Sequence, residues 1–186
     1  MARQLTTAEL EQGLDDILAS PKDNGALELI VRRPDVDERE SLAEGRLDID
    51  EGLVGDNWLR RGSRHMPGGG ADPEMQLNIM NARVVALVAD DPMRRELAGD
   101  QLYLDMDLSG ENLPPGTRLE IGDAVIEITE PPHTGCNKFA ERFGKDAVVF
   151  VNSGRGKQLN FRGINAKVVQ SGNIKVGDTA RKRAGS

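Results

Sequence analysis

The stretch TRLEIGDAVIEITE, from Thr117 to Glu130, indicates a β-hairpin. Apolar residues alternate with polar ones on both sides of Gly122-Asp123, a dipeptide that is favoured in the tight turns joining antiparallel strands. Strands alternate in this way when one face packs on a core and the other meets solvent. The hairpin therefore makes a β-rich fold the first expectation for this chain.

Further elements are predicted on both sides of the hairpin. The candidate strands are GALELIVRRP at 25–34, QLYLDMDL at 101–108, DAVVFVNSG at 146–154, and two strands within 164–182 around Ser171-Gly172-Asn173. Helices are predicted at 6–19, after a capping box of Thr6 and Glu9, and at 137–144, while 75–90 is expected to start as a strand and continue as a helix. Short strands with Gly turns and marginal helices predict a mainly β fold with peripheral helices (α+β), closed or curled into a β-barrel.

Composition narrows the class of protein. The 186 residues suit one domain with small additions, and 38% of them are hydrophobic. The net charge of −7, from 31 acidic and 24 basic residues, argues against nucleic acid as a partner. A single cysteine cannot form an internal disulfide, and no apolar segment has the roughly 20 residues that cross a bilayer. We therefore expect a cytoplasmic protein with no membrane partner.

The only cysteine of the chain lies in EPPHTGCNKFAERFG, residues 130–144. Cys136 directly precedes the predicted helix 137–144, where open backbone N–H groups favour thiolate over thiol, and His133, Lys138 and Arg142 add positive charge. A thiolate attacks electrophiles, carries sulfane sulfur or ligates a soft metal. The alternatives are that Cys136 is a small buried hydrophobe and that His133 only bonds a backbone carbonyl.

Three basic residues near the C-terminal strands are candidates for binding an anion. Arg155 and Lys157 belong to SGRGKQLNFRG, which is either a plain turn or an anion-binding loop. Arg162 has the planar guanidinium that suits phosphate or another oxyanion, and its alternative role is an ion pair with a carboxylate. No GxGxxG opens a helix and the Walker spacing is missing, so no dinucleotide or P-loop motif is predicted.

A second basic cluster precedes the run Gly68-Gly69-Gly70. It consists of Arg60, Arg61, Arg64 and His65. The cluster is either a solvated loop or a mobile flap that touches an anionic ligand.

The ordered motifs of the C-terminal half resemble the MOSC domain, the family named for the C-terminal domain of molybdenum-cofactor sulfurases. The residues that carry the resemblance are DLSGENLPPGTRLEIGDAVIEITEPPHTGC, ending at Cys136, and FRGINAKVVQSGNIKVGD, which begins at Phe161. The resemblance divides the chain into an N-terminal helix and strand at 1–34 that can join the barrel, a MOSC-like barrel at 35–180, and a tail at 181–186.

The resemblance implies a barrel with the cysteine at the mouth of a pocket. Cys136 would then ligate molybdenum in a bound pterin cofactor or carry a persulfide, with His133 nearby in the catalytic site. The residues expected to bind the cofactor, chiefly its phosphate, are Lys138, Arg155, Lys157, Asn160 and Arg162. Pyridoxal phosphate is not expected, because the chain is too short to hold the desulfurase domain of the larger sulfurases.

Three functions follow from these expectations. In the first, the protein binds the molybdenum cofactor and reduces N-hydroxylated or similar small substrates, with an electron-donor protein as redox partner. In the second, Cys136 is a sulfur carrier loaded by a cysteine desulfurase for the assembly of a metal–sulfur cofactor. In the third, the barrel binds a small ligand or a partner and its cysteine is inert.

Overall fold

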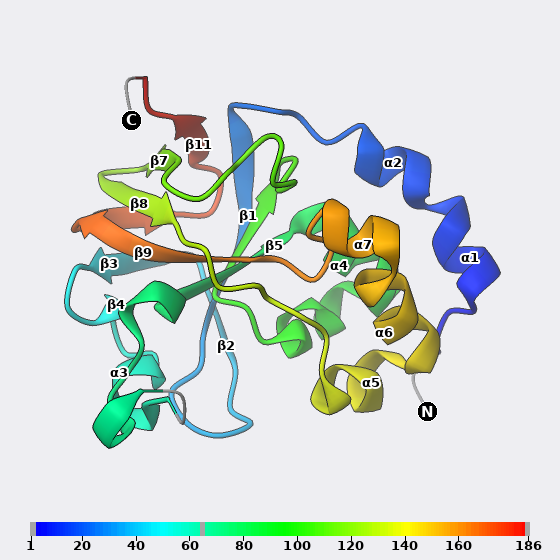
Figure 1. Ribbon diagram of the computed structural model, residues 1–186, viewed down its shortest axis with the longest axis horizontal. Coiled ribbons are helices and arrows are strands. Elements are labelled where there is room, and N and C mark those ends of the chain that lie inside the picture. Colours follow the sequence, from blue (N-terminus) through cyan, green and yellow to red (C-terminus); the bar gives the residue numbers. More distant parts are fainter. Residues whose placement is uncertain (1–2, 64–65, 185–186) are drawn as a thin grey trace.

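Seven strands in the described part of the chain close into a β-barrel (Figure 1). In order around the barrel they are β11 (Thr179–Lys182), β7 (Arg118–Ile121), β8 (Ala124–Ile128), β9 (Ile164–Gln170), β5 (Leu77–Asn81), β6 (Leu102–Asp105) and β1 (Gly25–Arg32). The pairing of β1 with β11 closes the sheet, and β2 (Glu40–Leu42) extends it beyond β1. This computed structural model describes residues 3–63 and 66–184. The predicted barrel with peripheral helices is confirmed.

The other elements form a small sheet and a set of helices around the barrel (Figure 1). The small sheet has the order β10 (Gly172–Lys175), β3 (Glu44–Asp48) and β4 (Gly52–Leu53). The α-helices are α1 (Thr7–Gln12), α2 (Leu14–Leu18), α3 (Trp58–Arg61), α4 (Ala82–Ala89), α5 (Asn137–Phe143), α6 (Lys145–Asn152) and α7 (Gly154–Gln158). Short 3-10 helices are η1 (Pro67–Gly69), η2 (Pro73–Met75) and η3 (Pro92–Ala98). No helix within the described ranges is long and apolar enough to span a membrane.

The hairpin that the sequence predicted is β7–β8. Its strands pair antiparallel, with Ile121 opposite Ala124 across the Gly122-Asp123 turn. Gly122 has a φ of 56°, and a Cβ there would lie 2.4 Å from the carbonyl oxygen of Asn173. Glycine is therefore required at this position both by the backbone angle and by the close approach of the neighbouring chain.

Two apolar cores stabilise the fold. The first fills the barrel and includes Leu27, Ile79 and Ile126. The second lies between the barrel and the helices, where Met80 and Tyr103 on the outer barrel face pack with Phe139, Phe143 and other helix residues. β5 is buried on both faces for this reason, and the predicted change from strand to helix within 75–90 is confirmed by β5 and α4.

The prediction of a strand at 146–154 is wrong, because this segment forms α6. Ala147, Phe150 and Val151 are buried while Val149 is 61% exposed, which is the spacing of a helix face. Packing of this face into the second core overrides the strand preference of the valines.

Two other predictions need correction in detail. The helix expected at 6–19 is divided into α1 and α2 at Gly13, where a Cβ would lie 2.6 Å from Leu87 of α4. The capping box of Thr6 and Glu9 is confirmed. The segment 164–182 contains three strands instead of two: β9 and β11 belong to the barrel, whereas β10 pairs with β3 in the small sheet.

Candidate functional site

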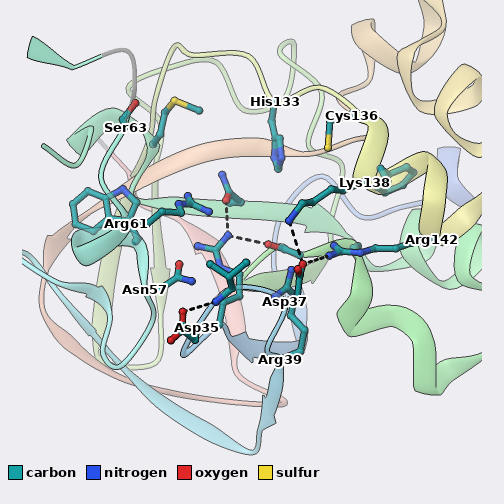
Figure 2. Close-up of a pocket in the computed structure, with 18 of the residues that line it drawn as sticks. Asp35, Asp37, Arg39, Asn57, Arg61, Ser63, His133, Cys136, Lys138 and Arg142 are labelled. Carbon is teal, nitrogen blue, oxygen red and sulfur yellow. Dashed lines mark hydrogen bonds and ion pairs between the residues drawn. The ribbon is translucent and has the colours of Figure 1, made fainter. Parts of the chain in front are cut away.

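A cavity of about 420 Å³ lies where the barrel meets α3 and α5. Its lining comes from 33–39 after β1, 57–63 around α3, 72–78 before and within β5, Ala98-Gly99, 133–142 around α5, and Arg162. Figure 2 shows His133 and Cys136 pointing into it from the same side, with Lys138 and Arg142 reaching toward Asp37. The barrel thus brings together segments that are far apart in the chain.

The loop that carries Cys136 is held at two points. The side chain of Asn152, at the end of α6, accepts from the backbone N–H of Gly135 at 2.9 Å and donates to its carbonyl at 3.1 Å. Further back, Asn165 of β9 donates to the carbonyl of Pro131 at 2.9 Å. A Cβ on Gly135 would come within 3.1 Å of Val151, so glycine permits the close packing of this loop on α6.

Cys136 is the N-cap residue of α5 and its side chain is exposed. Its φ of −118° and ψ of 179° are typical of an N-cap, but its side chain makes no capping hydrogen bond. α5 places Lys138, near its start, and Arg142, in its last turn, at the cavity and buries Phe139. The predicted helix after the cysteine is confirmed, including its C-cap at Gly144.

A buried ion pair forms one wall of the cavity beside His133. Arg162 donates from Nη1 to both oxygens of Asp100, at 2.9 and 2.7 Å, and from Nη2 to the carbonyl of Ala98. His133 Nδ1 is 3.3 Å from Asp100 Oδ1 without hydrogen-bond geometry. Burial and the positive charges of Arg162 and Arg33 hold the pKa of His133 well below its usual value, so its imidazole is neutral at pH 7.

A second buried pair lies near the first, where Arg33 Nη1 donates to the carbonyl of Gly99 beside Asp100. Arg33 donates from Nε and Nη2 to the two oxygens of Asp56, at 2.9 and 2.7 Å, in a fork geometry. Its Nη1 reaches Asn78, which donates to Asn165 at 2.6 Å. Because Asn165 also holds Pro131, one polar network connects this pair to the loop of Cys136.

Two arginines at the cavity have no carboxylate of their own. Within residues 3–63 and 66–184, the guanidinium of Arg61 has no hydrogen-bond or ion-pair partner, and that of Arg39 bonds only the carbonyl of Glu38. Burial, then Arg142 and Arg33, lowers the pKa of Arg39, and burial followed by Arg33 lowers that of Arg61. The cavity therefore has a surplus of positive charge.

Unpaired buried polar atoms are concentrated at this cavity. Five such side-chain atoms occur in the described part of the chain, and four of them belong to residues that line it. The four are Arg39 Nε, Asn57 Oδ1, His133 Nδ1 and Arg162 Nε. Buried polar groups are otherwise almost always paired, so a cluster of exceptions indicates a functional site.

The structure brings four of the predicted site residues together and places three elsewhere. Cys136, His133, Lys138 and Arg162 line the cavity. The other three, Arg155, Lys157 and Asn160, do not line it: the first two are exposed on α7, and Asn160 donates to the carbonyl of Leu108. For Arg162, the ion pair that was its alternative role is the one formed with Asp100. Of the predicted flap, Arg61 reaches the cavity, whereas Arg64 and His65 lie outside the described residues.

Sequence reasoning missed Arg33, Asp37, Arg39 and Asp100. A weak signal existed for two of them, because Arg33 and Asp100 are charged residues at the ends of apolar strands. Such positions often lie at the rim of a sheet, where sites form.

Among the described residues, no group of three or more His, Cys, Asp or Glu side chains is arranged to hold a metal ion.

The model of the MOSC domain matches residues 71–181. The chain belongs to the MOSC domain family. No curated protein matches it. Among solved structures, the YuaD protein of Bacillus subtilis is 19% identical with a TM-score of 0.57, over 84% of this chain and 94% of that one. YiiM of Escherichia coli is 18% identical with a TM-score of 0.55, over 87% of this chain and 71% of that one. YiiM of Geobacillus stearothermophilus is 11% identical with a TM-score of 0.53, over 87% of this chain and 73% of that one. At these identities the likeness concerns the fold.

The MOSC match divides the residues of the cavity into two groups. His133, Cys136 and Arg162 lie within the matched segment, as does Asp100, the partner of Arg162. Residues 33–63, which include two of the cavity's unpaired buried atoms, lie before it. This MOSC protein thus completes its cavity with residues from outside the part that identifies its family.

Proposed function

We propose that this MOSC protein binds a molybdenum–pterin cofactor, with the Cys136 thiolate as its one protein ligand to the metal. The observation that carries the proposal is the cavity itself: an exposed cysteine at a cavity with unpaired arginines. Molybdenum accepts soft sulfur ligands, and the two sulfurs of the pterin would accompany that of Cys136. The phosphate of the pterin needs donors, which the cationic side chains of the cavity supply.

The residues that line the cavity fit a molybdenum–pterin cofactor in size and charge. The cavity volume of about 420 Å³ is within the range of small-molecule sites. Arg39 and Arg61 have donors that no carboxylate of the described residues occupies, and Lys138 has a side chain 58% exposed. When bound, the cofactor would supply two-electron redox chemistry, and the MOSC resemblance favours small N-hydroxylated compounds as substrates and an electron-donor protein as partner.

The residues of the chain would have separate tasks. The Asn152 bonds hold the loop so that the thiol of Cys136 stays at the cavity. His133 is neutral at pH 7, so it would donate or accept a hydrogen bond toward a ligand without adding charge. Asp100 and Arg162 hold the wall behind His133 in place.

A sulfur-carrier role is the second candidate, favoured by the exposure of Cys136. In that role the Cys136 thiolate attacks the outer sulfur of a persulfide on a cysteine desulfurase. The sulfane sulfur moves to Cys136, and the donor's cysteine leaves as a thiolate.

The test compares wild type with Cys136→Ser, both purified without oxygen from a host that makes the cofactor. Serine is a strong N-cap residue, and Cys136 already has N-cap backbone angles, so the variant should fold at least as stably as wild type. The measurement is the molybdenum-to-protein ratio. We expect nearly one molybdenum per wild-type chain and loss of the metal in Cys136→Ser.

The other outcomes contradict the proposal in different ways. Equal metal in both proteins would remove Cys136 as a ligand. If neither protein holds metal, the cofactor proposal fails. A persulfide found by mass spectrometry on wild type, but not on Cys136→Ser, after incubation with a desulfurase and cysteine would then support the sulfur carrier.

A further inference from the structure

The loop after β1 places one carboxylate among three cations of the cavity. Asp37 Oδ1 lies 3.2 Å from Lys138 Nζ and 3.2 Å from Arg142 Nη2. Figure 2 shows both cations reaching across the cavity from α5 to this loop. Lys138, Arg142 and Arg39 together lower the pKa of Asp37, with Lys138 contributing most. Asp37 is therefore ionised: it forms ion pairs with Lys138 and Arg142, and Arg39 attracts it from a longer distance.

Two of the three cations, Arg39 and Arg142, are held close together by other contacts. A Cβ on Gly99 would lie 3.5 Å from Arg39 Nη2 and 3.6 Å from Arg142 Nη1, so both guanidinium groups pack against the same glycine. Arg142 also donates to the carbonyl of Leu97 at 2.8 Å, which keeps it in place. Like charges so near each other repel unless an anion lies between them.

Asp37 is held in this position only loosely. Its side chain is 63% exposed and that of Lys138 is 58% exposed, and ion pairs so open to solvent contribute little. Its φ of 61° lies in the left-handed region, which disfavours most residues but tolerates Asp and Asn. The backbone N–H of Glu38 bonds the carbonyl of Asp35, so Asp37 lies at the tip of a turn. The base of the loop is tied to α3, because Asn57 and Arg60 donate to the carbonyls of Arg33 and Pro34.

We propose that Asp37 occupies an oxyanion subsite formed by Lys138, Arg142 and Arg39, and that a phosphate group of a ligand displaces it. The carboxylate then acts as an internal competitor that neutralises the cations until the ligand enters. This inference deepens the proposed function, since the phosphate would be that of the pterin, but its test needs no cofactor.

The test measures binding of pyrophosphate to the cofactor-free protein by calorimetry at low salt, where screening is weak. Asp37→Asn removes the charge and keeps a side chain that tolerates a positive φ. Because each exposed pair contributes little, we expect Asp37→Asn to bind pyrophosphate about 2- to 30-fold more tightly than wild type. Lys138→Gln should weaken binding and reduce the gain from Asp37→Asn in the double variant.

Asp35→Asn is the matched control. Asp35 lines the same cavity on the same loop, but its carboxylate accepts from the backbone N–H of Val36 at 2.7 Å and lies 3.8 Å from Arg60, not at the Lys138 and Arg142 pair. Asp35→Asn makes the same change in net charge as Asp37→Asn. Because Asp35 does not contact Lys138 or Arg142, we expect a smaller gain in pyrophosphate affinity than with Asp37→Asn. The inference is overturned if Asp37→Asn binds no more tightly than wild type, if Asp35→Asn gains as much, or if Lys138→Gln leaves binding unchanged. These outcomes do not depend on whether Cys136 retains molybdenum.

Discussion

Replacing Arg162 with methionine tests the buried wall of the cavity. Asp100 is fully buried and the side chain of Arg162 is 8% exposed, with contacts of 2.7 and 2.9 Å between them. Removing one partner of a buried pair leaves an uncompensated charge, which typically costs about 3–5 kcal/mol. The loss includes the bond to the carbonyl of Ala98 and the stacking of the guanidinium 5.0 Å from the Phe139 ring. We expect Arg162→Met to lower the free energy of unfolding at pH 7 by this amount.

The stability lost in Arg162→Met should become smaller as pH falls. Burial already raises the pKa of Asp100 and Arg162 opposes this rise, so without the arginine the pKa rises further. Between the unfolded and folded pKa values the native state then binds more protons than the unfolded state. Stability of Arg162→Met should therefore increase as pH falls through this window, by up to about 1.4 kcal/mol per pH unit relative to wild type.

The assay is urea unfolding followed by circular dichroism at pH 7 and pH 5.5. Arg162→Met/Asp100→Asn should recover part of the loss, because it removes the buried charge as well. Arg118→Met is the surface control: its pair with Glu127 is 43% and 21% exposed, so less than about 1 kcal/mol is expected. A loss below about 1 kcal/mol for Arg162→Met, or a double variant as unstable as the single one, would refute the reasoning.

Three further changes test other parts of the structure. In wild type, His133 is protonated in the unfolded state as pH falls below about 6.5, which should lower the free energy of unfolding by up to about 1.4 kcal/mol per pH unit. In urea melts of His133→Gln, this pH-dependent loss of stability should be missing. Asn152→Ala removes two bonds to Gly135 and should cost about 1–3 kcal/mol, and by releasing the loop of Cys136 it should lower the molybdenum-to-protein ratio. Thr6→Ala removes an N-cap and should cost about 1 kcal/mol in thermal unfolding; no change would mean that the capping box does not stabilise the fold.

The candidate site was partly visible in the sequence. Cys136, His133 and Lys138 lie within six residues of one another, so a single local motif contains them, and Arg162 stood out as a basic residue before an apolar strand. Asp37 is about a hundred residues from Lys138 and nothing local joins them. Their contact exists because the loop after β1 and the helix α5 meet at one cavity.

α6 illustrates how local preference fails. The composition of the run DAVVFV favours a strand, but the same segment also has apolar residues at helical spacing, namely Ala147, Phe150 and Val151. Which pattern wins depends on what lies nearby, and the second core offers a surface that matches the helix face. A short apolar run cannot be assigned by periodicity alone.

By itself, the sequence determined the features that need only neighbours along the chain: the β7–β8 hairpin, the capping box before α1, the helix that follows Cys136, and the family. Turn dipeptides, caps and alternation act over a few residues, so their physics is complete in a short window. Only the tertiary structure decided the closure of the barrel through β1 and β11, the helical state of α6 and the set of cations around Asp37. These features depend on burial and charge between distant segments, whose free energies arise only when the chain has folded.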